Sequence, residues 1–169
     1  MKQLKPQLIG LITGAVMIIV ALVAFYGLHL PTTGKFQYVV YSVYTLGIIW
    51  TLLAFHKHSV DKIKFKDYFS EGFKMFIVVV LMMVVYTFVF VKMNPQIIAG
   101  FIEENNRQLA AQGNRTAAEI LANADNIRSL FPLTMVMGAT ITYLVIGALI
   151  SVVGAAFLSQ QKATAGHNR

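Results

Sequence analysis

Two pairs of neighbouring residues have side chains that could do chemistry. His56 and His58 form a His-x-His pair that could hold a metal ion, but two ligands are a weak signal, and histidines without a ligand role are the simpler interpretation. Glu103 and Glu104 are adjacent carboxylates, yet neighbours in a helix point about 100° apart and cannot easily share a substrate proton. The absence of cysteine excludes thiolate metal sites and disulfides. We therefore expect no catalytic residue, no metal site and no cofactor, which makes an enzyme improbable.

The elements that carry these residues follow from the placement of charge. All charged side chains, fourteen Lys or Arg and seven Asp or Glu, lie outside four apolar runs at residues 8–30, 36–55, 75–91 and 132–158. Each run is long enough, or nearly so, to cross a hydrocarbon layer of about 30 Å as a helix rising about 1.5 Å per residue. We predict an all-α integral membrane protein with four transmembrane helices. Its single domain, 1–169, has spans 8–30, 36–55, 73–91 and 132–158, a basic interfacial segment 56–72, a loop 92–131 and a tail 159–169.

The basic residues are sorted between alternate gaps of this pattern. Nine Lys or Arg residues lie at the amino terminus, in the segment after the second span and in the carboxyl tail, and the remaining five lie on the other side. Because cytoplasmic flanks carry the excess of Lys and Arg, we predict that both termini are cytoplasmic and that the loop 92–131 is periplasmic. No charged residue lies inside an apolar run, which argues against proton-coupled or ion-coupled transport.

The net charge of +7 points to an acidic partner. The basic cluster lies directly beside two spans, so anionic lipid headgroups are a simpler partner than nucleic acid, at about 1 kcal/mol for each lysine. Phenylalanines alternate with the lysines, which predicts a short amphipathic helix lying at the interface. The expected lipid contacts are Lys57, Lys62, Lys64, Lys66 and Lys74.

Small residues mark the predicted helix contacts. Gly10 and Gly14 form a small-xxx-small pair in the first span, which favours packing within the chain over a dimer. Pro132 suits the first turn of the fourth span. That span carries a stripe expected to meet either the Gly10/Gly14 face or the second span; its members are Gly147, Ser151 and Gly154.

The second span is the most polar of the four. Its polar side chains recur at helical spacing and predict a seam that points into the bundle or toward a polar ligand, with packing as the favoured interpretation. The residues of this seam are Tyr38, Tyr41, Ser42 and Thr45.

The loop 92–131 is the sizeable extramembrane segment. Asn94-Pro95 should end the third helix, and Gly113 should separate two short amphipathic helices. A hairpin of this kind could lie on the outer leaflet, cap the bundle or dock on a partner. The apolar residues expected at such a docking surface are Phe101, Ile102, Ile120, Leu121 and Ile127.

Several of these motifs occur together in a known family. The stretch Ile63-Lys-Phe-Lys-Asp-Tyr-Phe-Ser-Glu-Gly-Phe73, followed by Asn94-Pro95, Phe101-Ile-Glu-Glu104 and Gly113, resembles the domain-of-unknown-function family 4199. These are small four-span membrane proteins found mainly in Bacteroidota, and the resemblance covers nearly the whole chain. It implies a bacterial inner-membrane protein with a periplasmic loop before its last span, and it implies neither an activity nor site residues.

Two functional hypotheses remain. The leading one is a non-enzymatic accessory or structural subunit of an inner-membrane complex, with an integral-membrane protein or further copies of the chain as partner. The alternative is a small carrier or flippase-like protein for a lipid-linked or amphipathic substrate, which would use the polar seam and the basic segment.

Overall fold

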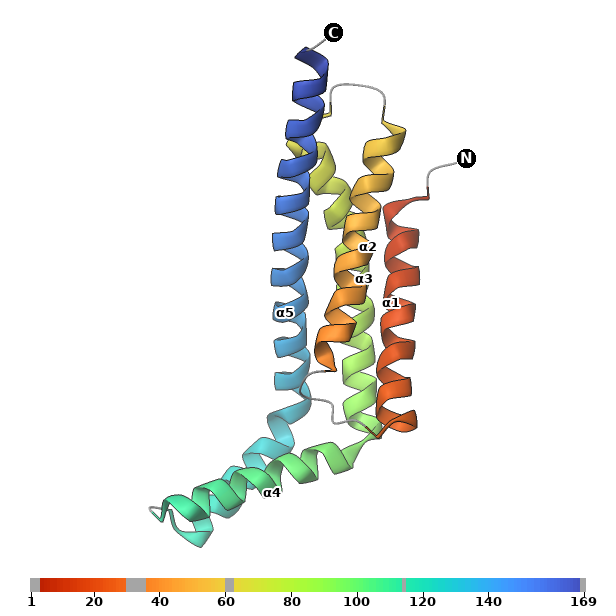
Figure 1. Ribbon diagram of the computed structural model, residues 1–169. Coiled ribbons are helices and arrows are strands. Elements are labelled where there is room, and N and C mark those ends of the chain that lie inside the picture. The colour runs from red at the N-terminus through yellow and green to blue at the C-terminus, as the bar shows by residue number, and fades with distance from the viewer. Residues whose placement is uncertain (1–3, 30–35, 60–62, 114, 168–169) are drawn as a thin grey trace. The chain divides into compact units, whose positions relative to one another are not determined.

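The computed structural model describes residues 4–29, 36–59, 63–113 and 115–167, and every described element is a helix (Figure 1). The all-α prediction is therefore confirmed. The elements are α1 (Pro6–Leu22), the π-helical turn η1 (Val23–Gly27), α2 (Gln37–His58), α3 (Phe65–Met93), α4 (Pro95–Gln112) and α5 (Ala117–His167).

Four helical segments are long and apolar enough to cross a membrane, as the charge pattern predicts. Because such segments can satisfy their backbone hydrogen bonds internally, they suit a hydrocarbon environment. The segments are Pro6–Gly27, Gln37–His58, Phe65–Met93 and Ala117–Gln161.

The chain divides into two compact units. The first unit contains the residues up to Met83 together with those from Ile141 onward, and the second unit is Val84–Thr140. In the first unit, α1, α2 and parts of α3 and α5 run side by side (Figure 1). Its core contains large side chains from all four helices, and the fully buried ones include Met17, Tyr44, Ile48, Leu52, Met75 and Val79.

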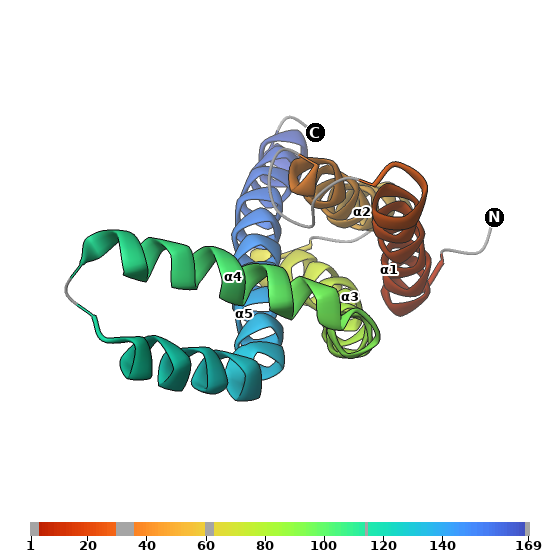
Figure 2. The same ribbon diagram turned by 90° about the horizontal axis from the view of Figure 1, so that it is seen from below.

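The second unit contains a helical hairpin. Figure 2 shows α4 and the first part of α5 lying alongside each other, with the connection between them at one end. Gly113 ends α4 in the left-handed conformation, with φ of 67°, which glycine adopts without steric cost. Thr116 and Glu119 then form a capping box at the start of α5, in which the Thr116 amide donates to the Glu119 carboxylate over 2.8 Å.

Two predicted boundaries are wrong. Pro132 does not begin a helix but lies inside α5, which starts at Ala117 and runs to His167. The preceding residues, Leu130 and Phe131, cannot cap a new helix, whereas the loss of a single amide donor at Pro132 is tolerated in a long helix.

The interfacial segment also differs from the prediction. Its residues from Phe65 onward are the first turns of α3 rather than a separate short helix. The Asp67 carboxylate accepts the Lys64 amide over 3.0 Å at this start, and no residue between Phe65 and the apolar run interrupts the helix. At its other end α3 stops at Met93, which confirms the stop predicted at Asn94-Pro95.

Candidate functional site

The polar seam of α2 is hydrogen-bonded within its own helix. The Ser42 hydroxyl donates to the Tyr38 carbonyl and the Thr45 hydroxyl donates to the Tyr41 carbonyl, both over 2.8 Å. The Tyr41 hydroxyl accepts a hydrogen bond from the Gln37 side chain over 2.7 Å. Tyr38 and Ser42 are exposed, and Tyr41 and Thr45 are half-buried. The seam therefore does not enclose a ligand. Among the described residues, these hydrogen bonds of its hydroxyls stay within α2 and do not reach another helix.

Tyr44 is the α2 tyrosine that reaches the interior, and we did not predict it as a site residue. It is fully buried, and its hydroxyl donates to the backbone carbonyl of Tyr143 in α5 over 3.1 Å. The Tyr143 ring meets the rings of Tyr41 and Tyr44 edge-on, with centroids 5.7 and 5.6 Å apart. The spacing of Val40, Tyr44 and Ile48 could have identified this face, because residues four apart lie on one side of a helix.

The small residues of α5 lie against α2 and α3. A Cβ at Gly147 would fall on the Tyr44 hydroxyl and 2.8 Å from the Phe76 ring, and a Cβ at Gly154 would lie 2.5 Å from Leu52. Ser151 faces Gly72, where a Cβ would lie 2.7 Å from the Ser151 hydroxyl. That hydroxyl is buried and has no hydrogen-bond partner among the described residues.

The glycine pair of α1 packs closely against α3. A Cβ at Gly10 would be 2.6 Å from the Met75 carbonyl oxygen, and a Cβ at Gly14 would be 2.7 Å from the Met82 sulfur. Of the two surfaces that we considered for the α5 stripe, the structure thus places the second span, not the Gly10/Gly14 face, beside it. Gly47 in α2, which we did not predict as a packing residue, lies close to α1. A Cβ at this glycine would be 2.6 Å from the Thr13 hydroxyl.

Most of the described lysines of the interfacial segment are exposed at one end of the first unit. Lys57 follows the apolar part of α2, Lys64 and Lys66 lie around the start of α3, and all three are exposed. Lys74 donates to Glu71 over 2.7 Å and is therefore partly neutralised. Lys62 lies outside the described residues.

Aromatic side chains accompany these lysines on α3. The Phe65 and Phe69 rings stack with centroids 6.1 Å apart, and the Phe69 and Phe73 rings lie at the same separation. Each pair is four residues apart, so the three rings form a stripe along one side of the helix. Such a stripe beside exposed lysines has the chemistry of a membrane interface.

The two histidines do not come together as a metal site. Nδ1 of His56 lies 2.6 Å from the hydroxyl of buried Tyr68, and the rings stack with centroids 5.9 Å apart. His58 is exposed at the end of α2. Within the described ranges, no group of three or more His, Cys, Asp or Glu residues could hold a metal ion.

The hairpin of α4 and α5 is closed by one apolar and one polar contact. The Phe101 and Phe131 rings lie 5.0 Å apart, and the Asn123 side-chain amide donates to the Asn105 oxygen over 2.7 Å. Ile102 is buried, which corrects its prediction as a docking residue, because no partner can reach it in this structure.

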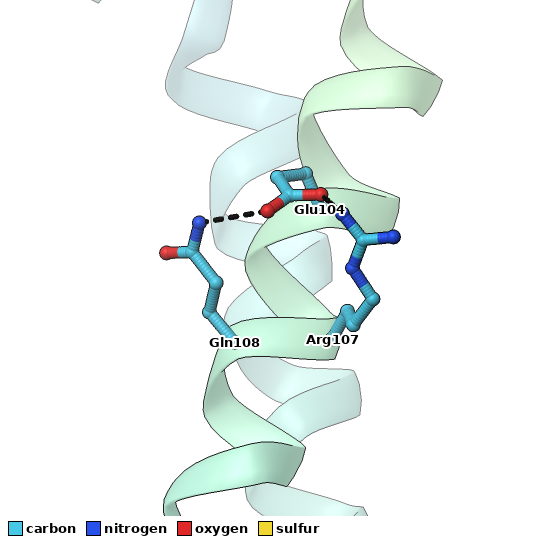
Figure 3. A network of polar contacts seen from close by, with 3 residues as sticks. All are labelled: Glu104, Arg107 and Gln108. Atoms are coloured by element: carbon cyan, nitrogen blue, oxygen red, sulfur yellow. Dashed lines mark hydrogen bonds and ion pairs between the residues drawn. The ribbon is translucent and has the colours of Figure 1, made fainter.

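The other predicted docking residues differ in exposure. Ile120 and Ile127 are half-buried, Phe101 is 47% exposed and Leu121 is 67% exposed. The neighbouring charges are largely paired within single helices. Glu104 lies between Arg107, with which it forms an ion pair, and Gln108, whose amide donates to it over 2.9 Å (Figure 3). Leu121 is thus an exposed apolar side chain on a hairpin where Glu104, Glu119 and Asp125 have partners and Glu103 is exposed.

A groove of about 290 Å³ lies between α1 and α2 in the first unit. Ile9, Ile12 and Val16 line it from α1, and Val43, Leu46 and Trp50 line it from α2. The close approach of Thr13 and Gly47 forms its floor. The seam hydroxyls of α2 do not line this groove.

Comparison with known proteins shows which family the chain matches. The family model described as "Protein of unknown function (DUF4199)" matches residues 8–160, which contain the four apolar runs 8–30, 36–55, 75–91 and 132–158. Neither a curated protein nor a solved structure matches the chain.

Proposed function

We propose that the chain, which belongs to the DUF4199 family of proteins of unknown function, is a non-enzymatic accessory or structural subunit of a complex in the bacterial cytoplasmic membrane. The observation that carries this proposal is Leu121, which is 67% exposed on a hairpin where Glu104 and Asp125 are paired with arginines of their own helices. Phe101 and Leu130 are also exposed on this hairpin, and several exposed apolar side chains on one element suit a contact with another protein better than one alone.

The proposed orientation places both termini in the cytoplasm and the hairpin in the periplasm. Lys57, Lys64 and Lys66 are exposed at the end of the first unit that also holds the start of α1 (Figure 1). On the hairpin, Arg107 pairs with Glu104, Arg128 lies 3.6 Å from Asp125, and Arg115 is exposed. Because orientation follows the number of Lys and Arg residues near the span ends and not their pairing, the lysine cluster favours the cytoplasmic side.

The composition of the interior supports a role without catalysis. Among the buried side chains of the described residues there is no Asp, Glu, Lys, Arg or His. The buried polar groups are hydroxyls and one amide, and Thr51 donates to the Gly47 carbonyl of its own helix over 2.9 Å. These hydroxyls and this amide, of which the Ser151 hydroxyl has no partner among the described residues, offer no acid, base or metal ligand set.

The carrier hypothesis has less support. It requires a polar groove beside Tyr41 and Thr45, whereas the groove between α1 and α2 is lined mostly by aliphatic side chains. The hydroxyl of Thr45 is also engaged by the backbone of its own helix. We therefore favour the subunit role.

The test is purification from native membranes in a mild detergent, followed by mass spectrometry. The variant is Leu121→Glu, and the matched control is Ala122→Glu, which places the same charge on the next exposed residue, about 100° around the helix. A protein partner should accompany the wild type and the control in fixed stoichiometry and be lost from Leu121→Glu, because a buried unpaired carboxylate is costly at an interface.

One result would contradict the subunit role, and another would contradict the place of Leu121 in it. One is a wild-type chain that purifies alone as a monomer from its native membrane. The other is a partner retained equally by both glutamate variants, which would remove Leu121 from the contact.

A further inference from the structure

We infer that the groove between α1 and α2 holds one acyl chain of an anionic phospholipid and that Lys5 and Lys57 bind its phosphate. The proposal concerns a site on the first unit and does not depend on the subunit role. It is carried by the shape of the groove together with the charge at its open end.

The walls of the groove suit a hydrocarbon chain. Ile9, Ile12 and Val16 lie on one face of α1, and Thr13 closes the floor against Gly47 of α2. The volume of about 290 Å³ is near the lower bound of small-molecule sites, about 300 Å³, and is therefore suited to one chain rather than a whole lipid.

The face of α2 that lines the groove ends in a lysine. Val43, Leu46 and Trp50 lie at spacings of three and four residues, so they share this face. Lys57 follows Trp50 by seven residues, which is about two helical turns, and so continues the same face about 10 Å farther along α2. Trp50 is 65% exposed beside the groove and precedes the lysine, as expected for a tryptophan near headgroup level.

The face of α1 ends in a lysine at the same end of the unit. Lys5 precedes Ile9 by four residues and directly precedes the first turn of α1, which contains no acidic residue. Because α1 and α2 run antiparallel, the start of α1 and the end of α2 lie at one end of the first unit (Figure 1). Both lysines are exposed, and in the described part of the chain neither joins an ion pair.

An anionic phospholipid matches both parts of this site. Its acyl chain would exchange one apolar environment for another, so the groove alone gives little selectivity over other lipids. The two ammonium groups supply the selectivity. Each lysine near a negative headgroup is worth about a fivefold preference, so the pair should favour an anionic over a zwitterionic lipid by up to about 30-fold.

The single tryptophan provides a direct test, since Trp50 lies at the groove. The full chain is reconstituted in phosphatidylcholine bilayers that contain phosphatidylglycerol brominated along its acyl chains, and Trp50 fluorescence is measured. Bromine quenches tryptophan by contact, so quenching reports occupancy. Brominated phosphatidylglycerol should reach half-maximal quenching at a much lower mole fraction than brominated phosphatidylcholine.

The variants separate this site from the general basic surface. Lys5→Gln/Lys57→Gln should abolish the preference for the anionic lipid, a loss of up to about 30-fold. The matched control, Lys64→Gln/Lys66→Gln, removes two exposed lysines of α3 that do not continue the groove faces and should retain the preference.

Four outcomes would overturn the proposal. Equal quenching by the two brominated lipids would show that headgroup charge does not matter. An equal loss in both lysine variants would indicate a diffuse surface potential. Displacement of the brominated lipid by soluble glycerol phosphate would indicate a site for a free phosphate. Quenching that falls as the protein density in the bilayer rises would show that a second copy of the chain covers the groove.

Discussion

The contact between Gly147 and Tyr44 makes a quantitative prediction about the stability of the first unit. Replacing Gly147 by alanine places a methyl group on the Tyr44 hydroxyl and 2.8 Å from the Phe76 ring. Both neighbours are almost fully buried, so neither can swing away into free space. We expect Gly147→Ala to destabilise the protein, although alanine is the better helix former.

The magnitude follows from comparison with a second glycine of the same helix. Gly138 has no atom within 4 Å of its Cβ position, so Gly138→Ala adds a methyl group without a clash. The gain in helix preference, about 1 kcal/mol, is common to both substitutions and cancels. Overpacking costs about 1–3 kcal/mol. Loss of the hydrogen bond to the Tyr143 carbonyl adds about 0.6 kcal/mol, a typical value inside a membrane. Gly147→Ala should thus be less stable than Gly138→Ala by about 1.6–3.6 kcal/mol.

The assay is reversible unfolding in mixed detergent micelles with a rising fraction of denaturing detergent, followed by helical circular dichroism. Tyr44→Phe gives a second arm, because it removes the hydroxyl that the new methyl group would meet. Tyr44→Phe/Gly147→Ala should be more stable than the sum of the single changes allows, with a coupling free energy of about 1 kcal/mol. The Phe76 contact remains in the double variant, so the rescue should be partial.

Two results would refute this reasoning. If Gly147→Ala matched Gly138→Ala in unfolding free energy, α5 would not approach α2 and α3 as closely as described. If the two single changes were strictly additive, Tyr44 would not be the group that fills the space beside Gly147.

Three further predictions concern other contacts. Gly10→Ala should destabilise the first unit more than Gly14→Ala, by about 1 kcal/mol in the same micelle assay, because its methyl group meets a backbone carbonyl rather than a flexible methionine. Asn123→Ala should remove a hydrogen bond worth about 1 kcal/mol from the hairpin and speed amide exchange in α4 without affecting α1. The Thr116 amide and hydroxyl lower the pKa of Glu119, which lies outside the apolar run 132–158. This carboxylate therefore supports the start of α5 fully above its ordinary pKa, and the support is lost as the pH falls through the lowered value. Amide protection there should fall in acid for the wild type and be independent of pH in Glu119→Gln.

The four long apolar helices were predictable because charge excludes a residue from hydrocarbon more strongly than any other local property. The end of α3 was predictable for a local reason too, since Pro95 supplies no amide donor and restricts Asn94. The start of α5 was not. Pro132 suits a first turn and is also tolerated within a long helix, and the one local sign against a new helix there is the lack of a capping side chain at Leu130 and Phe131.

The inward face of α2 could not be read from polarity alone. A tyrosine, serine or threonine in a span can bond to its own helix or point toward a neighbour, and both choices satisfy the same hydroxyl. Ser42 and Thr45 take the first choice, whereas Tyr44 takes the second because Gly147 leaves room for its ring. The spacing of Val40, Tyr44 and Ile48 indicates which face of α2 points inward, but the room beside Gly147 is a property of two helices together.

The residues that stabilise the first unit differ from the residues proposed to bind other molecules. Hydroxyls that donate within α2 add nothing between helices, so the close contacts at glycines must supply much of the cohesion. The groups assigned to binding, Lys5, Lys57 and Leu121, are exposed and take no part in those contacts. Their substitution should leave the unfolding free energy within about 0.5 kcal/mol of the wild type while abolishing binding. If Lys5→Gln/Lys57→Gln or Leu121→Glu instead destabilised the chain as much as Gly147→Ala, the lost binding would reflect damage to the fold, and both proposed surfaces would have to be abandoned.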